Sequence, residues 1–166
     1  MNCRHCNHLL EHIFLDLGFA PPSNAYLGED DLIKPEHYYP LKLLVCEQCW
    51  LVQTEDYAQA DELFSDDYAY FSSISQSWMT HSARYTEMIT KRLGLNKNSH
   101  VIEVAANDGY LLKNFVSAGI PCLGIEPTAS TAEAAEKLGI PILREFFGQT
   151  LAKELEAEGR RADLIL

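Results

Sequence analysis

The fold of this 166-residue chain is decided by the stretch Val101-Ile102-Glu103-Val104-Ala105-Ala106-Asn107-Asp108-Gly109-Tyr110-Leu111-Leu112. Residues 101–105 have the pattern of a short buried strand, and residues 108–118 have that of a helix closed by Gly119. The chain therefore runs from a buried strand, through a tight loop of small and turn-forming residues, straight into a helix. Such a loop lets a ligand approach the backbone and the N-terminus of the helix.

Alternation of strands and helices continues to the end of the chain. Further strands are predicted over 121–125, 140–143 and 162–166, and further helices over 129–138 and 150–158. This alternation predicts an α/β fold with about four parallel strands and right-handed crossovers, the first half of a doubly wound, Rossmann-like sheet. Because inner strands of such a sheet need neighbours on both sides, we expect the chain to be a truncated piece. We also expect the free sheet edge to favour self-association.

The N-terminal residues have a different character. Short strands over 12–17 and 39–45 lie among turn residues such as those at 21–24, and a helix is predicted over 75–93. We therefore predict three parts: a small β-rich domain over 1–66, a linking helix region over 67–94, and the α/β half-domain over 95–166.

Four of the five cysteines form two C-x-x-C pairs, Cys3–Cys6 and Cys46–Cys49. Two such turns can supply the four thiolates of a tetrahedral zinc site, and a full set of protein ligands makes that zinc structural. His5 or His8 replacing one cysteine, a redox pair, and plain core cysteines remain as alternatives. The fifth cysteine, Cys122, lies in an apolar segment and is predicted to be a small buried side chain.

Composition narrows the class of protein. With 47% hydrophobic and 22% charged residues the chain is globular, and its net charge of −11 disfavours binding to nucleic acid or to anionic membranes. No stretch approaches eighteen apolar residues, and the charged first twenty residues do not resemble a signal peptide. We expect a cytoplasmic protein.

The chemistry of the 101–112 loop favours a cationic ligand. The G-x-G-x-x-G pattern of dinucleotide sites is missing, since Gly109 is the one glycine of the loop. A pyrophosphate would be repelled by Glu103 and Asp108, whereas a ligand with a sulfonium and an amino group suits them. Glu126, at the end of the next strand, is placed to accept hydrogen bonds from both hydroxyls of a ribose. Taken alone, Glu103 and Asp108 also fit a simple charge effect at a helix N-terminus.

An ordered set of motifs extends along the whole chain. The set is Cys3-x-x-Cys6, Leu15-Asp16-Leu17-Gly18, Pro21-Pro22-Ser23-Asn24-Ala25-Tyr26-Leu27, Tyr39-Pro40-Leu41, Cys46-x-x-Cys49, Asp67-Tyr68-Ala69-Tyr70-Phe71-Ser72-Ser73 and the 103–112 loop. In this order the motifs resemble the N-terminal portion of zinc-binding sugar C-methyltransferases, which act on nucleotide-linked 4-keto deoxysugars. The resemblance implies a transfer of a methyl group from S-adenosylmethionine to a sugar carbon beside a ketone.

The resemblance also implies roles for individual residues. The cofactor would meet Glu103, Ala105, Asn107, Gly109 and Glu126, to which the acidic loop adds Asp108. Tyr68 or Tyr70 would handle a proton or orient a group, although both also fit the role of packing aromatics. The catalytic base is expected beyond Leu166, so residues 1–166 alone are expected to be inactive. Ala105 and Asn107 stand where glycines are frequent in methyltransferase loops.

Other functions remain open at this point. One is a methyltransferase with a different small-molecule substrate, such as a keto acid or a polyketide-bound group. Another is a zinc-ribbon interaction module fused to a nucleotide fold without turnover. An NAD-dependent enzyme is disfavoured by the missing glycines.

Overall fold

The computed structural model describes residues 1–55, 57–66 and 68–166. Asp67, the first residue of the motif that contains Tyr68 and Tyr70, therefore lies outside the described residues. The chain divides into two compact units, Met1–Leu63 and Phe64–Leu166, and each is described here by itself.

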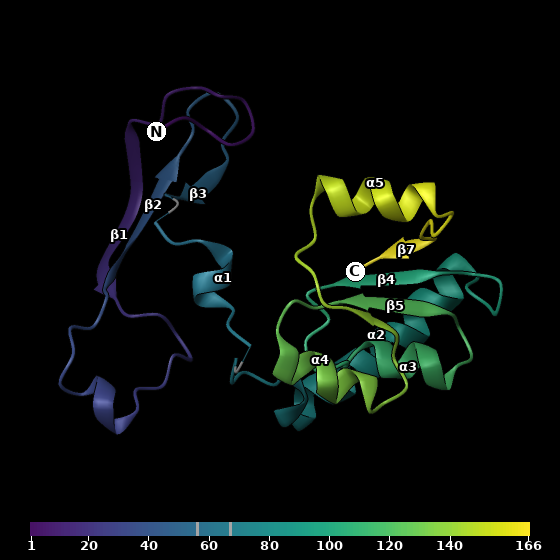
Figure 1. The fold of residues 1–166 in the computed structure, drawn as a ribbon. Coiled ribbons are helices and arrows are strands. Elements are labelled where there is room, and N and C mark those ends of the chain that lie inside the picture. Colours follow the sequence, from purple (N-terminus) through teal and green to yellow (C-terminus); the bar gives the residue numbers. More distant parts are fainter. Residues whose placement is uncertain (56, 67) are drawn as a thin grey trace. The chain divides into compact units, whose positions relative to one another are not determined.

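The first unit is built on a three-stranded antiparallel sheet. Its order is β1-β2-β3, with β1 at His12–Ala20, β2 at Tyr39–Val45 and β3 at Val52–Thr54 (Figure 1). The predicted strands over 12–17 and 39–45 are thus confirmed, whereas β3, the 3₁₀ turn η1 (Glu29–Asp31) and α1 (Ala60–Leu63) were not predicted. The buried core of this unit is very small and consists of Cys3, Leu10, Leu44 and Cys46.

The second unit is an α/β structure. After the 3₁₀ turn η2 (Ser72–Ile74) its elements are α2 (Gln76–Leu93), β4 (Val101–Val104), α3 (Leu112–Ser117), β5 (Cys122–Ile125), α4 (Ala129–Glu136), β6 (Ile142–Leu143), α5 (Gln149–Ala157) and β7 (Leu164–Ile165). The four strands are parallel, in the order β6-β5-β4-β7. The first strand of the unit, β4, therefore has the second on one side and the fourth on the other. This order confirms the predicted fold class.

Helices cover both faces of the parallel sheet (Figure 1). Helices α2, α3 and α4 lie on one face, where Phe115, Leu112 and Val101 are completely buried. Helix α5 lies on the other face and packs Leu151 and Leu155 against the sheet. Burying both faces explains why the strands are nearly continuous apolar runs.

Helix α3 is shorter than its sequence pattern predicts. The prediction begins it at residue 108, but it begins at Leu112, four residues later. The cause is local, because Asn107 and Gly109 have positive φ angles of 51° and 77°, which a right-handed helix does not accept. The loop after β4 is thereby lengthened into a wide turn.

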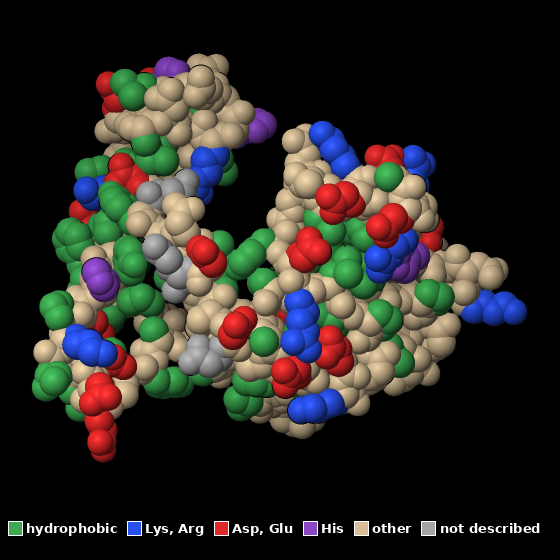
Figure 2. Space-filling model, in the orientation of Figure 1, with side chains coloured by type: hydrophobic (Ala, Val, Ile, Leu, Met, Phe, Trp, Pro, Cys, Tyr) green, Lys and Arg blue, Asp and Glu red, His purple; other side chains and the backbone are tan. Residues whose placement is uncertain are grey.

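Charged side chains are mixed on the face of the second unit that Figure 2 shows. Surface ion pairs join Arg144 to Glu136 at 2.7 Å and Arg161 to Glu156 at 2.6 Å. Among the described residues, none of the helices combines the length and the apolar character that crossing a bilayer requires.

Candidate functional site

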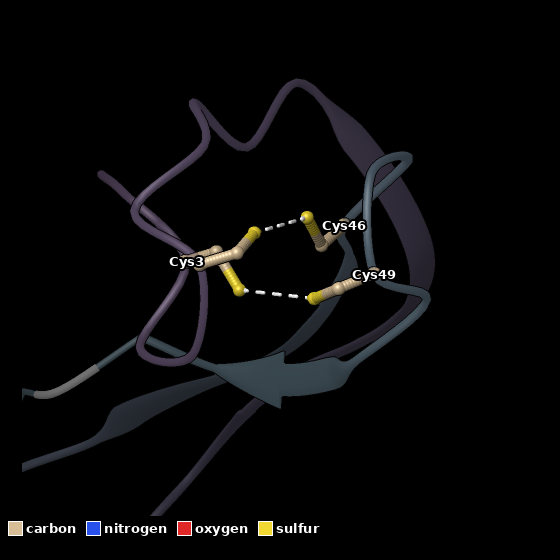
Figure 3. A group of neighbouring side chains, drawn as sticks. Cys3, Cys46 and Cys49 are labelled. Carbon is tan, nitrogen blue, oxygen red and sulfur yellow. Dashed lines mark hydrogen bonds between the residues drawn. The ribbon is translucent and has the colours of Figure 1, made fainter.

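The two C-x-x-C pairs converge at one end of the small sheet of the first unit. The turn between β2 and β3 contributes Cys46 and Cys49, and the N-terminal turn contributes Cys3 and Cys6, so that the sulfurs face one another (Figure 3). The four sulfurs lie within 4.8 Å of one another. The Sγ–Sγ distances are 3.6 Å for Cys3–Cys49 and 3.5 Å for Cys6–Cys46, and no disulfide is formed.

This geometry suits a tetrahedral zinc ion. Zinc–sulfur bonds of about 2.3 Å place tetrahedral sulfurs about 3.8 Å apart, close to the separations observed. The hydrogen bond from the backbone N–H of Cys6 is the largest effect on Cys3 and helps lower the pKa of its thiol to about 6. For Cys49 the hydrogen bond from the backbone of Leu51 is the largest single effect, but burial and the neighbouring sulfurs outweigh it and raise the pKa to about 12. Crowded thiols of this kind do not all ionise without a cation, which a zinc ion would supply. The four residues predicted as ligands are thus brought together, and as a closed set they would hold a structural ion.

A glutamine beside the cysteines supports the cluster, and sequence patterns did not single it out. The buried amide of Gln53 donates to the sulfur of Cys3 at 3.3 Å and accepts from the backbone N–H of Arg4 at 3.0 Å. His8, an alternative ligand from its position, instead contacts Glu47, its Nε2 lying 3.1 Å from a carboxylate oxygen. Hydrogen bonds to ligand sulfurs orient them and tune the metal.

A cavity of about 390 Å³ opens in the second unit where β4 and β5 end. It is lined by Phe64, Tyr68, Tyr70, Ser72, Val104, Ala105, Asn107, Tyr110, Ile125, Glu126, Pro127, Glu145, Phe146 and Phe147. Ligands of doubly wound folds bind at this edge, beside the point where the strand order reverses. Five of the predicted site residues, Tyr68, Tyr70, Ala105, Asn107 and Glu126, share this cavity.

Glu126 is 5% exposed and already makes several hydrogen bonds. Its Oε2 accepts from the backbone N–H of Asn107 at 2.8 Å, and its Oε1 accepts from the backbone N–H and the hydroxyl of Thr128 at 3.0 and 2.5 Å. A carboxylate offers about four acceptor positions, so about one, on Oε2, remains unoccupied. That position suits one hydroxyl of a ribose, whereas the sequence alone allowed for two.

Glu103 is not among the residues that line this cavity. It lines a second cavity of about 310 Å³, together with Trp78, Tyr85 and other residues. Its side chain is 3% exposed, and its Oε2 has no hydrogen-bond partner among the described residues. Burial, then the charges of Asp108 and Glu126, raise the pKa of Glu103 to about 8. The two cavities share Val104, Ala105 and Tyr110, so they flank the same loop.

Asp108 and Gly109 line neither of these two cavities. Asp108 is buried, and one of its oxygens accepts from the backbone N–H of Ser73 at 3.0 Å. A Cβ on Gly109 would lie 2.3 Å from the side chain of Ile140 and 3.1 Å from that of Ala135. Packing of α4 against the loop therefore accounts for this glycine.

Comparison with known proteins bears on both units. Residues 3–64 match the methyltransferase-associated family described as "Putative zinc binding domain". This segment is thus similar to that family's zinc-binding domain. The C-methyltransferase NovU of Streptomyces niveus is 28% identical over 163 residues, which cover 98% of this chain and 39% of NovU. The chain thus spans 39% of the length of that relative. The predicted resemblance to the N-terminal portion of zinc-binding C-methyltransferases is confirmed.

A solved structure also aligns with part of the chain. It is titled "Crystal structure of MccD protein" and is 21% identical, covering 52% of this chain and 31% of that chain with a TM-score of 0.29. At that score the superposition carries no argument about fold or function.

Proposed function

We propose that the protein is part of an S-adenosylmethionine-dependent C-methyltransferase that acts on a nucleotide-linked keto-deoxysugar. The observation that carries the proposal is the cavity at the ends of β4 and β5, with Glu126 on its wall. It lies in a chain that aligns over 98% of its length with a C-methyltransferase.

Electrostatics support a cationic cofactor. Three buried carboxylates, Glu103, Asp108 and Glu126, lie on or beside the loop after β4. One oxygen each of Glu103 and Asp108 has no hydrogen-bond partner among the described residues. Since burial raises the pKa of Glu103 to about 8, Glu103 holds its proton at neutral pH, and a bound cation would favour its ionisation. A poorly solvated site of acidic groups therefore favours a cation and disfavours a pyrophosphate. A sulfonium with an ammonium group fits this field, and a dinucleotide does not.

The lining of the cavity supports an adenosine. Phe146 and Phe147 follow β6 and present aromatic surface, and Pro127 and Ile125 add apolar surface. Apolar and aromatic walls with a few polar groups are typical of nucleoside sites. The open acceptor position of Glu126 would take a ribose hydroxyl, and the adenine would lie toward the two phenylalanines.

The tyrosines are the groups of this chain that would serve the reaction. S-adenosylmethionine, when bound, would supply an electrophilic methyl group. A base would remove the proton from the carbon beside the sugar ketone, the enolate carbon would bond to the methyl group, and the bond from the methyl group to sulfur would break to leave S-adenosylhomocysteine. The side chain of Tyr70 is 52% exposed, whereas the ring of Tyr68 lies 5.4 Å from that of Phe64. We assign to Tyr70 the donation of a hydrogen bond to the enolate oxygen, which stabilises the developing negative charge.

Calorimetric titration of S-adenosylhomocysteine and of NAD⁺ into the zinc-loaded chain tests the cofactor assignment. We expect S-adenosylhomocysteine to bind, weakly in this chain, and NAD⁺ not to bind. Binding of NAD⁺ alone would contradict the proposal, and binding of neither would favour a zinc-ribbon interaction module.

Transfer of a labelled methyl group to a panel of acceptors tests the substrate class. The panel compares nucleotide-linked 4-keto deoxysugars with free keto acids, and Tyr70→Phe serves as the variant. Residues 1–166 alone are expected to show no turnover, so the assay is run on the chain and on longer forms of the protein. A preference for keto acids would contradict the sugar assignment.

A further inference from the structure

The segment that contains both tyrosines is attached to α4 and to the loop after β4 by side chains rather than by a strand ladder. Residues 68–71 have no regular secondary structure, and residues 72–74 form the short turn η2. We call residues 68–73 the tyrosine segment. At one end, the hydroxyl of Ser130 donates to the carbonyl of Tyr68 at 2.8 Å. At the other end, the backbone N–H of Ser73 donates to Asp108 at 3.0 Å.

Asn107 makes the central attachment. Its Oδ1 accepts from the backbone N–H of Ser72 at 2.9 Å, and its Nδ2 donates to the carbonyl of Tyr70 at 3.0 Å. One carboxamide thus pairs with a donor and an acceptor on either side of Phe71. An aspartate would offer only acceptors, and a glycine would offer neither group.

The backbone of Asn107 connects this attachment to the cavity. Its φ of 51° lies in the left-handed region, which asparagine tolerates better than most residues. In that conformation its N–H donates to Oε2 of Glu126 at 2.8 Å. A continuous path of hydrogen bonds therefore runs from Glu126, through Asn107, to the main chain of Tyr70.

We propose that Asn107 is a positioning residue that holds the tyrosine segment against the cavity and couples ligand binding at Glu126 to the placement of Tyr70. The positioning role rests on the hydrogen bonds alone, whereas the coupling rests on the function proposed above. Asn107 acts through its neighbours, because the segment engages both functional groups of its side chain, and each group keeps one further hydrogen-bonding position.

Amide hydrogen exchange in the ligand-free, zinc-loaded chain tests the positioning role. Asn107→Gly keeps the left-handed backbone accessible and removes both side-chain hydrogen bonds. The amide of Ser72 is then expected to exchange faster by about tenfold or more. Asn107→Asp keeps an acceptor for Ser72 and is expected to give a smaller change. The amide of Gly124, which donates to Pro141 within the sheet, reports whether the fold is intact.

Asn114 provides a matched control. Its Nδ2 also donates to main-chain carbonyls, those of Tyr110 and Leu111, but not to the tyrosine segment. Asn114→Asp makes the same chemical change as Asn107→Asp, and it is expected to leave the exchange of the Ser72 amide unaltered. The positioning role would be overturned if the Ser72 amide exchanged at the wild-type rate in Asn107→Gly. It would also be overturned if Asn114→Asp changed the exchange rate of Ser72 as much as Asn107→Asp does.

A double-mutant cycle tests the coupling. The affinity for S-adenosylhomocysteine is measured for Asn107→Gly, for Glu126→Gln and for the double variant. If the two residues act through one path, the double variant loses less than the product of the two single losses. Independent, multiplicative losses would overturn the coupling. If the wild-type chain binds no S-adenosylhomocysteine, the proposed function and the coupling are both wrong. The exchange rate of the Ser72 amide would still decide the positioning role.

Discussion

At the scale of single residues, Glu103 differs most from an ordinary glutamate. Its carboxyl group is buried beside Asp108 and Glu126, and burial is the main cause that raises its pKa to about 8. A carboxyl group that titrates near neutral pH without a cation beside it is typical of a site that a positively charged group completes.

Replacing Glu103 by glutamine should change how stability depends on pH. Since the pKa of Glu103 rises from 4.5 to about 8 on folding, the folded state holds its proton more tightly than the unfolded state. Its contribution to the free energy of unfolding is therefore complete below about pH 4.5 and is lost as the pH rises through about 8. Glu103→Gln is expected to abolish this loss, on the order of 1–3 kcal/mol, in urea unfolding followed by amides of β4 and β5.

The exposed residue Glu154 supplies the control for this pH experiment. Glu154→Gln also removes one carboxylate from the second unit but should leave the pH dependence unchanged. If the free energy of unfolding of Glu103→Gln depends on pH as that of the wild type does, the buried carboxyl group of Glu103 is not the source of that dependence.

Replacing Glu126 by alanine should weaken the binding of S-adenosylhomocysteine. A hydrogen bond to a charged group contributes about 1.5–3 kcal/mol, so the expected loss is roughly tenfold or more. Part of it arises because the backbone N–H of Asn107 and the hydroxyl of Thr128 lose their acceptor. Glu145→Ala, at another point of the cavity lining, is the comparison. If Glu126→Ala binds S-adenosylhomocysteine with wild-type affinity in calorimetric titration, Glu126 is not part of the binding site.

At the scale of elements, the turn from β4 into α3 decides where the site lies. The positive φ angles of Ala105, Asn107 and Gly109 delay the helix until Leu112 and widen the loop. The widened loop has a cavity on either side of it and provides the attachment for the tyrosine segment. A helix that began at residue 108 would fill this space.

Gly109→Ala should destabilise this turn strongly. A left-handed alanine costs about 1–2 kcal/mol, and the collision of its Cβ with Ile140 and Ala135 adds roughly 1–3 kcal/mol. Gly119→Ala is the matched control, since Gly119 has a φ of 68° and no atom within 4 Å of the added Cβ. Equal losses of the free energy of unfolding for the two variants would contradict the packing explanation of Gly109.

At the scale of the whole molecule, the two units differ in what holds them together. The second unit buries apolar side chains on both faces of its sheet. The first unit buries two leucines and two cysteines, and its strand β1 exposes Phe14, Leu17 and Phe19. So small a core does not stabilise a fold by itself, and we expect a metal ion held by the four cysteines to supply much of its stability.

Removing one zinc ligand should therefore unfold one unit and spare the other. Cys46→Ser is expected to lose the metal and to collapse the amide spectrum of residues 1–63, whereas the amides of β4 and β5 stay dispersed. Cys122→Ala, which changes a cysteine outside the cluster, should keep one zinc per chain by elemental analysis. Wild-type protein free of zinc, with its first unit folded, would contradict the prediction.

The sequence by itself determined most of the strands and helices, the parallel sheet, the paired cysteines and the resemblance to C-methyltransferases. These follow from short-range patterns, because apolar periodicity, glycine stops and C-x-x-C spacing act within a few residues. Tertiary structure decided which loop residues face the cavity, because their partners lie far away in the chain. Asn107 forms hydrogen bonds with Tyr70 and Ser72, which are about 35 residues away in the sequence. Gly109 packs against Ile140, which is about 30 residues away. Such contacts depend on how helices and loops pack on the sheet, and no local pattern encodes that packing.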